Sequence, residues 1–353
     1  MSVLTQDSIQ LLQKLIATPS FSEEEAGTAT HLKNWFEAHQ MTYNEIGHTV
    51  WATNKNYDPN KPNLLLNSHH DTVKPNKAYT RDPFAPTLED GKLYGLGSND
   101  AGGALVSLLA CFTHFYEMPA LHHNLIFVAS VEEETAGPKS LRGILDQLPP
   151  IAVAIVGEPT QMQMAIAEKG LLVFDAIVKG TPSHAAHPND DNPIQKLPEV
   201  LKWFQDYTFD QVSPVLGPVK MTVTQVAAGS QHNVVPAQVE LVVDVRVNDC
   251  YSNQELAAQL TAAAPCELHA RSLHLESSAI PENHPLVEAG KALGRTTYGS
   301  PTLSDQAALN CPSLKMGPGD SQRSHSADEF IFVDEIEEAI HLYIQLLTKY
   351  LLP

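Results

Sequence analysis

Segments typical of buried β-strands alternate with helical segments through the first half of the chain. The strand-like runs are "NLLLNSH", "NLIFVASVEEE" and "IAVAIVGEPT", and helical patterns such as "GGALVSLLACFTHFYEM" and "KSLRGILDQL" separate them. Strands that alternate with helices are typical of a sheet with parallel neighbours and helices on both faces. We therefore predict an α/β fold built on a largely parallel mixed sheet flanked by helices.

The order of the elements changes near residue 170. "GLLVFDAIVKG", "PVKMTVTQVAAG" and "AQVELVVDVRV" have strand patterns, and helical segments lie near "NPIQKLPEVLKWFQDY" and "NQELAAQLTAAA". A chain of 353 residues is also long for one compact domain. We predict a larger domain of residues 1–169 plus 283–353, interrupted by a smaller α+β domain of residues 170–282.

The charge of the chain disfavours some classes of binding partner, and its cysteine content disfavours one class of metal site. Lysine and arginine total 22 against 41 acidic residues, a formal net charge of -19. Nucleic acids and anionic membranes attract basic surfaces, so we expect neither as a partner. The four cysteines are far apart and form no CxxC pair, which favours reduced, mostly buried thiols over a thiolate zinc site. No apolar run approaches the roughly 20 residues that span a bilayer, and we expect a cytoplasmic protein.

Residues of metal-binding types follow the ends of four apolar runs, and one more precedes a helix in "YGLGSNDAGGAL". They are His69, His70, Asp71, Asp100, Glu132, Glu133, Glu134, Glu158 and His325. In open parallel sheets, sites form beyond the carboxyl ends of the strands. Carboxylates that gather there repel one another unless protons or a cation neutralise them. Nitrogen and oxygen ligands without sulfur suit zinc, cobalt or manganese, so we predict a divalent metal site.

Two other enzyme classes fit the sequence poorly. "GLGSND" superficially resembles a dinucleotide-binding turn, but Asp100 stands where the third glycine should be. No G-x-S-x-G occurs in the chain, which disfavours a serine hydrolase.

Taken in order, seven motifs resemble those of the co-catalytic di-zinc metallohydrolases. They are "SHHDT", "GLGSNDAGG", "SVEEETAG", "VGEPT", "GTPSHAAHP", "HNVVP" with "DVRV", and "GPGDSQRSHSADEF". This family includes the aminoacylases, glutamate carboxypeptidase, the desuccinylase of diaminopimelate synthesis and the acetylornithine deacetylases, the subgroup that the chain resembles most. The resemblance covers nearly the whole chain. It implies a metal-dependent amide hydrolase that removes the acyl group from an N-acyl amino acid, with N-acetylornithine of arginine biosynthesis as the expected substrate.

The resemblance also implies two zinc ions per chain, with cobalt or manganese as alternatives. One ion would be bound by His69, Asp100 and Glu158. The other would be bound by Asp100, Glu134 and His325, so that Asp100 bridges the two.

Several neighbouring residues receive supporting roles. The resemblance implies that Asp71 orients His69, because a carboxylate fixes the tautomer of a ligand imidazole. His70 points to the opposite face if the segment is extended, so we expect it to be structural. Glu132 stands where relatives often carry aspartate. The family also tends to have a cis peptide after the bridging aspartate, which we expect at Asp100–Ala101.

The resemblance assigns the chemistry to Glu133 and His184. Glu133 would act as general base, taking a proton from the attacking water and passing it to the leaving amine. His184 in "PSHAAHP" would stabilise the oxyanion in the neighbouring subunit of a homodimer formed through the inserted domain. We expect His187, three residues on, to be structural.

Matches to substrate-contacting positions fall on Asn233 and Arg246, and Arg323 is a further candidate because it lies two residues from His325. An arginine fork suits a substrate carboxylate, although Arg246 could equally form a salt bridge on its strand. Alternative substrates in the family are N-succinylornithine, N-acetylcitrulline and N-acetyl-lysine, or dipeptides and C-terminal residues of peptides. The alternative of a different class is a non-catalytic metal-binding protein on the same fold, which the presence of Glu133 disfavours.

Overall fold

The computed structural model describes residues 2–352, and the chain divides into two compact units. The first unit takes in the chain up to Ile166, Ala279–Tyr298 and the chain from Ser304 onward. The second comprises Ala167–Ser278 with Gly299–Leu303. Each unit has an apolar core of its own.

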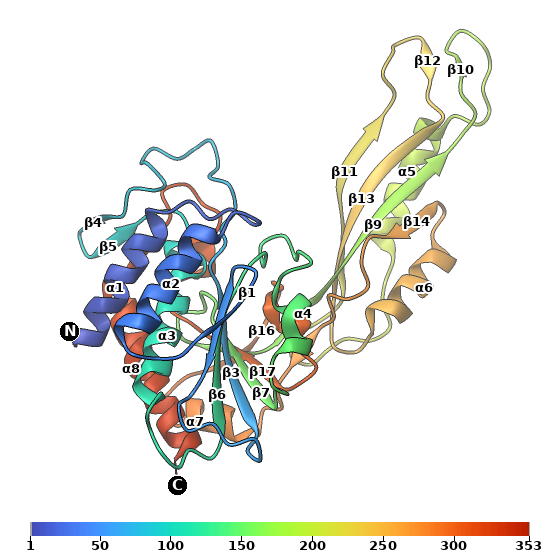
Figure 1. Cartoon of the computed structure of the whole chain (residues 1–353). Helices are drawn as coiled ribbons and strands as arrows, with labels where there is room; N and C mark the ends of the chain where they lie inside the picture. The colour runs from blue at the N-terminus through green and yellow to red at the C-terminus, as the bar shows by residue number, and fades with distance from the viewer. Residues whose placement is uncertain (1, 353) are drawn as a thin grey trace. The chain divides into compact units, whose positions relative to one another are not determined.

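A mixed sheet organises the first unit (Figure 1). Its strand order is β1-β2-β6-β3-β7-β17-β8-β15, with β16 paired to β8. The strands are β1 (Asn44–Ile46), β2 (Thr49–Thr53), β3 (Asn63–His69), β6 (Asn124–Ser130), β7 (Val153–Val156), β8 (Met164–Glu168), β15 (Ser278–Ala279), β16 (Thr297–Ser300) and β17 (Ser313–Lys315). The central neighbours β6, β3, β7 and β17 run parallel, and β2 and β8 join them antiparallel. The predicted α/β class and largely parallel mixed sheet are confirmed.

The apolar run of β3 is continuous because both faces of the sheet are covered. All seven of its residues are buried. Leu64 and Leu66 belong to the core formed with the helices of one face, whereas Leu65 belongs to a second core on the other face. Successive side chains of a strand alternate between faces, so consecutive leucines of a strand covered on both sides fill both cores.

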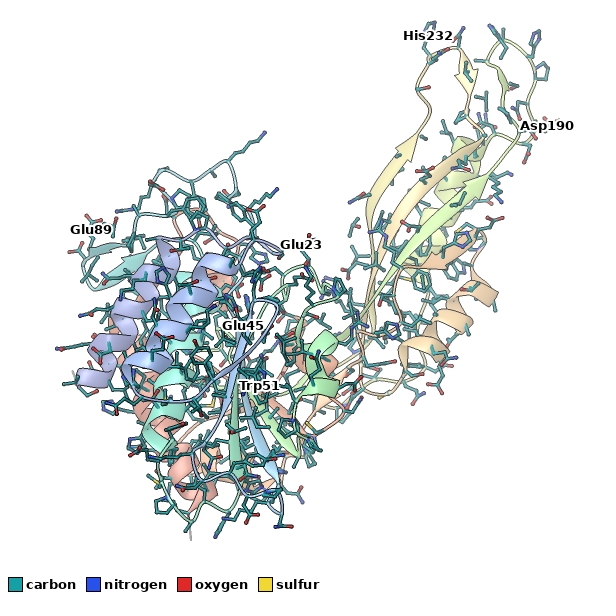
Figure 2. The ribbon with its side chains drawn as sticks, in the orientation of Figure 1. Glu23, Glu45, Trp51, Glu89, Asp190 and His232 are labelled. Carbon is teal, nitrogen blue, oxygen red and sulfur yellow. The ribbon has the colours of Figure 1, made fainter. Side chains whose placement is uncertain are left out.

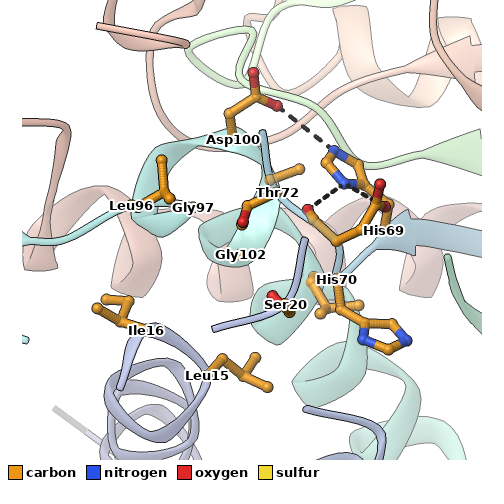
Figure 3. Close-up of a pocket in the computed structure, with 13 residues that line it drawn as sticks. Leu15, Ile16, Ser20, His69, His70, Thr72, Leu96, Gly97, Asp100 and Gly102 are labelled. Atoms are coloured by element: carbon orange, nitrogen blue, oxygen red, sulfur yellow. Dashed lines mark hydrogen bonds and ion pairs between the residues drawn. The ribbon is translucent and has the colours of Figure 1, made fainter. Parts of the chain in front are cut away.

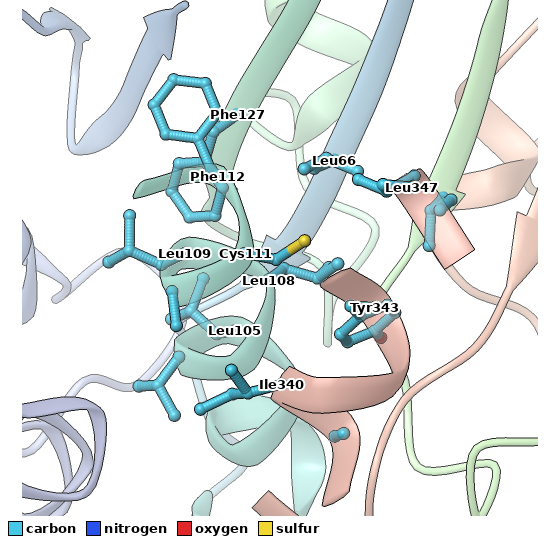
Figure 4. Close-up of a cluster of buried hydrophobic side chains, with 14 of the residues drawn as sticks. Leu66, Leu105, Leu108, Leu109, Cys111, Phe112, Phe127, Ile340, Tyr343 and Leu347 are labelled. Carbon is cyan, nitrogen blue, oxygen red and sulfur yellow. The ribbon is translucent and has the colours of Figure 1, made fainter. Parts of the chain in front are cut away.

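Helices cover both faces of this sheet. One face carries α1 (Val3–Ile16), α2 (Ala26–Ala38), α3 (Gly103–Phe115), α7 (Pro285–Lys291) and α8 (Val333–Leu351), and the other carries the short α4 (Leu141–Ile144) (Figure 1). Helix α3 lies between the sheet and α8, and Leu108, Phe112 and Tyr343 are fully buried at this packing (Figure 4). Within residues 2–352, none of the helices has the length and apolar character needed to cross a membrane.

The second unit is an antiparallel sheet packed on two helices. Its strand order is β11-β13-β9-β14, and a separate ribbon pairs β10 with β12. The elements are β9 (Gly170–Lys179), β10 (Ser183–His184), α5 (Pro193–Asp206), β11 (Lys220–Ala228), β12 (Val234–Val235), β13 (Gln238–Val247), α6 (Asn253–Ala263) and β14 (Glu267–Ala270). Buried and less buried residues alternate along β9 and β13. This is the pattern of a sheet with one face on a core.

Three details differ from the sequence predictions. The helix predicted over residues 139–148 is reduced to α4 and one 3₁₀ turn, η2 (Leu145–Gln147). All four cysteines are free, but only Cys111 is buried, so the expectation of mostly buried thiols is wrong. A small sheet of β4 (Thr87–Glu89), β5 (Lys92–Tyr94) and β18 (Phe330–Phe332) had no counterpart in the prediction.

Candidate metal centre

The residues of metal-binding types lie at the carboxyl edge of the parallel strands. His69 is the last residue of β3, and Glu134 and Glu158 lie shortly after β6 and β7. Asp100 lies in η1 (Ser98–Gly102), a turn that is kinked at Asp100 and Ala101 and leads into α3. His325 lies in the loop that follows η4 (Ser321–Arg323). The parallel direction of β6, β3 and β7 places these ends together.

Asp100 stands between two histidines. Its Oδ1 is 3.5 Å from His69 Nε2, and its Oδ2 is 3.6 Å from His325 Nε2. Glu158 Oε1 lies 3.8 Å from His69 Nε2, and Glu134 Oε2 lies 3.0 Å from His325 Nε2. The structure therefore brings the five predicted ligands together, with one oxygen of Asp100 on each side.

These residues fit a metal ion. The Nε2 atom of His69 is buried and has no hydrogen-bond partner, although buried polar atoms nearly always have one. Two ligand atoms that are each about 2.1 Å from one tetrahedral ion lie about 3.4 Å apart, close to the separations around His69. Within the described residues, two groups have ligand atoms within 4.8 Å of one another: His69, Asp100 and Glu134, and His69, Glu133 and Glu158.

Asp71 joins His69 to the loop that carries the glutamates. The main-chain oxygen of Asp71 is hydrogen-bonded to His69 Nδ1 at 3.0 Å. Its Oδ1 lies 3.3 Å from the same nitrogen and accepts a hydrogen bond from Glu133 N at 3.1 Å. Its Oδ2 accepts hydrogen bonds from Glu134 N at 3.2 Å and from Ser22 Oγ at 2.7 Å. The carboxylate thus faces the imidazole as predicted for an orienting residue, and it also fixes the main chain of the two glutamates.

The gathered carboxylates favour an added positive charge. Burial raises the pKa of Glu133 well above its ordinary value; the charge of His69 opposes this, and the charges of Glu158, Asp305 and Glu134 act in the same direction as burial. Burial likewise raises the pKa of Glu158 to about 8, with Asp100 acting in the same direction. A hydrogen bond with Glu134 raises the pKa of His325 to about 9. Bound cations would relieve this repulsion.

The centre opens on the side of His325. The exposed fraction of the side chain is 1% at His69, 12% at Glu158 and 55% at His325. On the opposite side, beneath His69 and next to α1, lies a cavity of ≈ 20 Å³ (Figure 3). That volume holds about one water molecule, so this cavity is too small for a substrate.

His70 points away from the cluster. Its Nδ1 lies 2.8 Å from Thr28 Oγ1 and its Nε2 lies 3.2 Å from the carbonyl oxygen of His48. Burial lowers the pKa of His70 to about 4, so the ring is neutral at pH 7. These contacts attach the strand end to α2 and give the side chain a structural place in the fold.

The backbone around the site has two further features. The peptide bond Asp100–Ala101 is cis, as the resemblance led us to expect. Glu132 has a φ of 54°, and its carboxylate accepts a hydrogen bond from Lys139 N at 3.0 Å. The side chain of Glu132 therefore closes its own loop.

Two buried carboxylates near the ligands were not singled out from the sequence. Asp305 accepts a hydrogen bond from Ser130 Oγ at 2.6 Å, at the end of β6. Glu329 accepts hydrogen bonds from the main chain of η1. Glu329 lies inside the quoted motif "GPGDSQRSHSADEF", but its residue type alone gave no reason to separate it from its acidic neighbours.

His184 and Asn233 lie side by side on the β10–β12 ribbon of the second unit. His184 pairs with Val234, and Ala185 N donates a hydrogen bond to Asn233 O at 2.9 Å. His184 is exposed, and the loops next to this ribbon carry Asp190 and His232 (Figure 2). The catalytic role of His184 and the substrate contact of Asn233 stay predictions.

Both predicted arginines have carboxylate partners within the chain. Arg246 Nε lies 2.9 Å from Asp244 Oδ1, two residues away on β13. Arg323 donates two hydrogen bonds to Glu335, of 2.8 and 2.6 Å, and its guanidinium lies 5.0 Å from the centre of the Phe330 ring. Their substrate contacts stay predictions, and each would require a change of partner.

Comparisons with known proteins connect this centre to one family. The profile of "Peptidase family M20/M25/M40" matches residues 65–349. An acetylornithine deacetylase of Proteus mirabilis is 28% identical, over 100% of this chain and 99% of its own. A succinyl-diaminopimelate desuccinylase of Wolbachia pipientis is 24% identical, over 98% of this chain and 94% of its own.

A solved structure shares the fold. The M20 family metallo-carboxypeptidase Sso-CP2 of Sulfolobus solfataricus has a TM-score of 0.77 and 19% identity, over 99% of both chains. The profile match spans most of the chain, including all five residues at the candidate metal centre. The chain belongs to peptidase family M20/M25/M40 and is a hydrolytic enzyme of that family.

Proposed function

We propose that the enzyme is a metal-dependent deacylase of N-acyl amino acids, with N-acetylornithine of arginine biosynthesis as its substrate. The observation that carries the proposal is the position of Glu133. One of its carboxylate oxygens lies within 4.8 Å of a His69 nitrogen and of a Glu158 oxygen. An acid–base group thus stands directly beside ligand atoms, where an activated water and an amide carbonyl would meet.

We assign the metal ligands from the pairs of close contacts. His69, Asp100 and Glu158 would hold one ion, and Asp100, Glu134 and His325 the other. Zinc is the proposed metal, with cobalt or manganese as alternatives, because the donor set is imidazole and carboxylate without sulfur. When bound, two such ions lower the pKa of a water molecule and polarise a carbonyl oxygen.

The chain's own residues would then move the proton. Glu133 takes a proton from the attacking water and donates it to the amide nitrogen as the amine leaves. Asp71 keeps Glu133 in place through the main-chain hydrogen bond at 3.1 Å.

For the substrate, we favour an acetylated over a succinylated amino acid. The acetylornithine deacetylase of Proteus mirabilis is 28% identical to the chain and the Wolbachia desuccinylase 24%. The net charge of -19 would also attract the cationic end of ornithine. Asn233 and Arg246 are our candidates for contacting the substrate, with the substrate carboxylate replacing Asp244 at Arg246.

We assign Arg323 a structural role in its own loop, because it is paired with Glu335 and stacked on Phe330.

We further propose a homodimer through the second unit, in which His184 acts in the neighbouring subunit. Strand β11 supports this, because it is the edge strand of the four-stranded sheet and most of its residues are exposed. A long edge strand offers its unpaired main-chain groups to a second chain. His184, also exposed, could donate a hydrogen bond to an oxyanion.

Release of free amine tests the proposed reaction. The purified enzyme would be given N-acetylornithine, N-succinylornithine, N-acetylcitrulline, N-acetyl-lysine, N-succinyl-diaminopimelate and a dipeptide, with zinc, with cobalt and after chelation. We expect metal-dependent release that is fastest from N-acetylornithine. Preference for another acyl amino acid would correct the substrate, and preference for the dipeptide would favour a peptidase, the second candidate that the similarity to Sso-CP2 suggests. Two bound metals without release from any of these compounds would move the proposed substrate to other peptides.

A further inference from the structure

Glu329 is a buried carboxylate outside the predicted ligand set. Its exposed fraction is 2%, and it lies in the chain just before β18. Within the described residues it belongs to neither group that could hold a metal ion. Because a buried charge needs hydrogen-bond partners, the contacts of Glu329 indicate its role.

All three hydrogen bonds of this carboxylate come from one short stretch of main chain. Its Oε1 accepts from Asn99 N at 2.8 Å and from Asp100 N at 3.0 Å. Its Oε2 accepts from Gly97 N at 3.1 Å. One side chain therefore holds the main chain of η1 up to Asp100, the residue whose two oxygens face the two histidines.

A second link joins the same stretch to the loop of His325. The side chain of Asn99 accepts a hydrogen bond from Asp320 N at 2.9 Å and donates one to Asp320 O at 3.1 Å. Asp320 and Glu329 lie on either side of His325 in the chain. Both ends of the His325 loop are thus attached to the segment that carries Asp100.

The carboxylate is the side-chain type that these contacts require. A carboxylate has two acceptor oxygens and no donor, so it can satisfy three N–H groups. A glutamine of the same shape would turn its NH₂ group towards N–H donors. An alanine would leave buried N–H groups without acceptors.

We propose that Glu329 is a positioning residue for the bridging ligand. It fixes the main chain of Asp100 so that the two carboxylate oxygens of Asp100 face His69 and His325 at matching distances. Glu329 itself touches neither substrate nor metal. This inference rests on the proposed two-metal hydrolase, and it concerns metal binding as much as turnover.

The test compares Glu329→Gln and Glu329→Asp with the wild type. We expect Glu329→Gln to bind Co²⁺ or Zn²⁺ at least about tenfold more weakly, as is common for residues that orient ligands. We also expect it to change the visible spectrum of the cobalt-loaded protein and to lower kcat with little change in KM. Glu329→Asp keeps the charge on a shorter side chain, so it should recover part of the lost affinity.

Asp328→Asn provides a matched control. Asp328 is the preceding residue, and its carboxylate also accepts hydrogen bonds from main-chain N–H groups, those of Thr80 and Arg81, both at 2.9 Å. Those groups lie outside η1. We expect this variant to lose some stability and to keep the metal affinity and cobalt spectrum of the wild type.

The readouts separate this inference from the proposed function. If no acyl amino acid is hydrolysed, metal affinity and the cobalt spectrum still decide the role of Glu329. A folded Glu329→Gln protein with wild-type metal affinity, spectrum and turnover would overturn the inference. If Glu329→Gln does not fold, the same comparison applies to Glu329→Asp, and wild-type metal affinity in that shorter variant would equally count against a positioning role.

Discussion

Asp71 contacts more groups than it would need to contact if it only oriented His69. One of its oxygens is shared between the imidazole and Glu133 N, and the other between Glu134 N and Ser22 Oγ. The pKa of Asp71 lies below its ordinary value, because hydrogen bonds and the charge of His69 outweigh the effect of burial. A single buried carboxylate thus links one candidate ligand to the proposed general base and to another candidate ligand.

Replacing this carboxylate by an amide should loosen the metal centre. In Asp71→Asn, one oxygen becomes an NH₂ group that faces N–H donors, so we expect metal affinity to fall about 10- to 100-fold. Competition with a chelator measures it. Ser22→Ala, which removes only the hydroxyl contact at 2.7 Å, is the control and should lose less. Unchanged affinity in Asp71→Asn would contradict the role.

Glu133 should be dispensable for metal binding and necessary for turnover. We expect Glu133→Gln to keep two ions per chain and to lose about 10²- to 10⁴-fold in kcat, the usual contribution of a general acid–base group. Metal content by elemental analysis is the control. Turnover that stays near the wild-type rate would exclude Glu133 as the base.

At the residue scale, the sequence predicted the candidate site residues that lie in recognisable motifs, but not the residues that hold them in place. The predicted ligands His69 and His325 are 256 residues apart, and the structure brings both to Asp100. Ser22, Asp305 and Glu329 act through hydroxyl or main-chain contacts. Such contacts depend on where the backbone passes, and neither residue type nor spacing reveals that.

Among the elements, the fully buried strands were the most predictable. The run "NLLLNSH" coincides with β3, because three consecutive leucines in a strand buried on both faces leave a clear pattern. The three-residue strands β4, β5 and β18 show no such period. β4 and β5 form a short hairpin, but the pairing of β18 with β5 joins residues far apart in the chain, which local patterns do not encode.

The turn η1 depends on close packing at Gly102. A Cβ atom there would lie 2.4 Å from Gly97 O and 2.6 Å from Leu12 Cδ1. We expect Gly102→Ala to lower the free energy of unfolding by about 1–3 kcal/mol and to weaken metal binding, because the backbone that carries Asp100 must shift. Urea unfolding and metal titration measure the two effects.

Gly217→Ala is the control for Gly102→Ala, because it introduces backbone strain away from the candidate metal centre. Gly217 has a φ of +69° with open space around it, and it lies in the second unit. Its replacement should cost about 1–2 kcal/mol without affecting metal affinity. Equal loss of affinity in both variants would show that η1 is not the cause.

Protonation of His123, which contacts Tyr350 of helix α8, should make the free energy of unfolding depend on pH. His123 Nε2 lies 3.2 Å from Tyr350 OH, and His122 and His284 also face His123. Burial, and then these two histidines, lower the pKa of His123 in the folded state. As pH falls below about 6.5, the unfolded chain takes up the proton first. The free energy of unfolding should therefore fall below that pH and be retained above it.

Urea unfolding at several pH values on both sides of about 6.5 tests this dependence. We expect His123→Gln to have a smaller loss of stability on acidification than the wild type. An identical pH dependence in the two proteins would assign the effect to other groups.

At the scale of the whole molecule, the change of pattern near residue 170 pointed to an inserted unit. The structure divides the chain at Ile166 and Ala279 and returns Gly299–Leu303 to the second unit. That last short stretch had no signal in the sequence, because five residues are too few to show a period. The long alternating strands β9 and β13 did show one.

Mixing two inactive proteins tests whether subunits share sites. Glu133→Ala and His184→Ala should each be inactive as homodimers. If His184 acts in trans, equal mixing with subunit exchange gives heterodimers in half of the dimers, each with one intact site, or about a quarter of wild-type activity. His187→Ala, which alters the neighbouring ring at 5.8 Å, should remain active alone. No recovery after proven exchange would exclude the shared site.

The spread of the candidate ligands along the chain has a consequence for protein synthesis. His69, Asp100, Glu134 and Glu158 leave the ribosome before the second unit is made, and His325 follows only after it. A nascent chain therefore exposes a cluster of acidic side chains with only one of its two histidines. Capture of the second ion would be a late step in maturation, and truncated chains would be released without it. Metal supply would then decide which newly made molecules become mature and which are left for proteolysis.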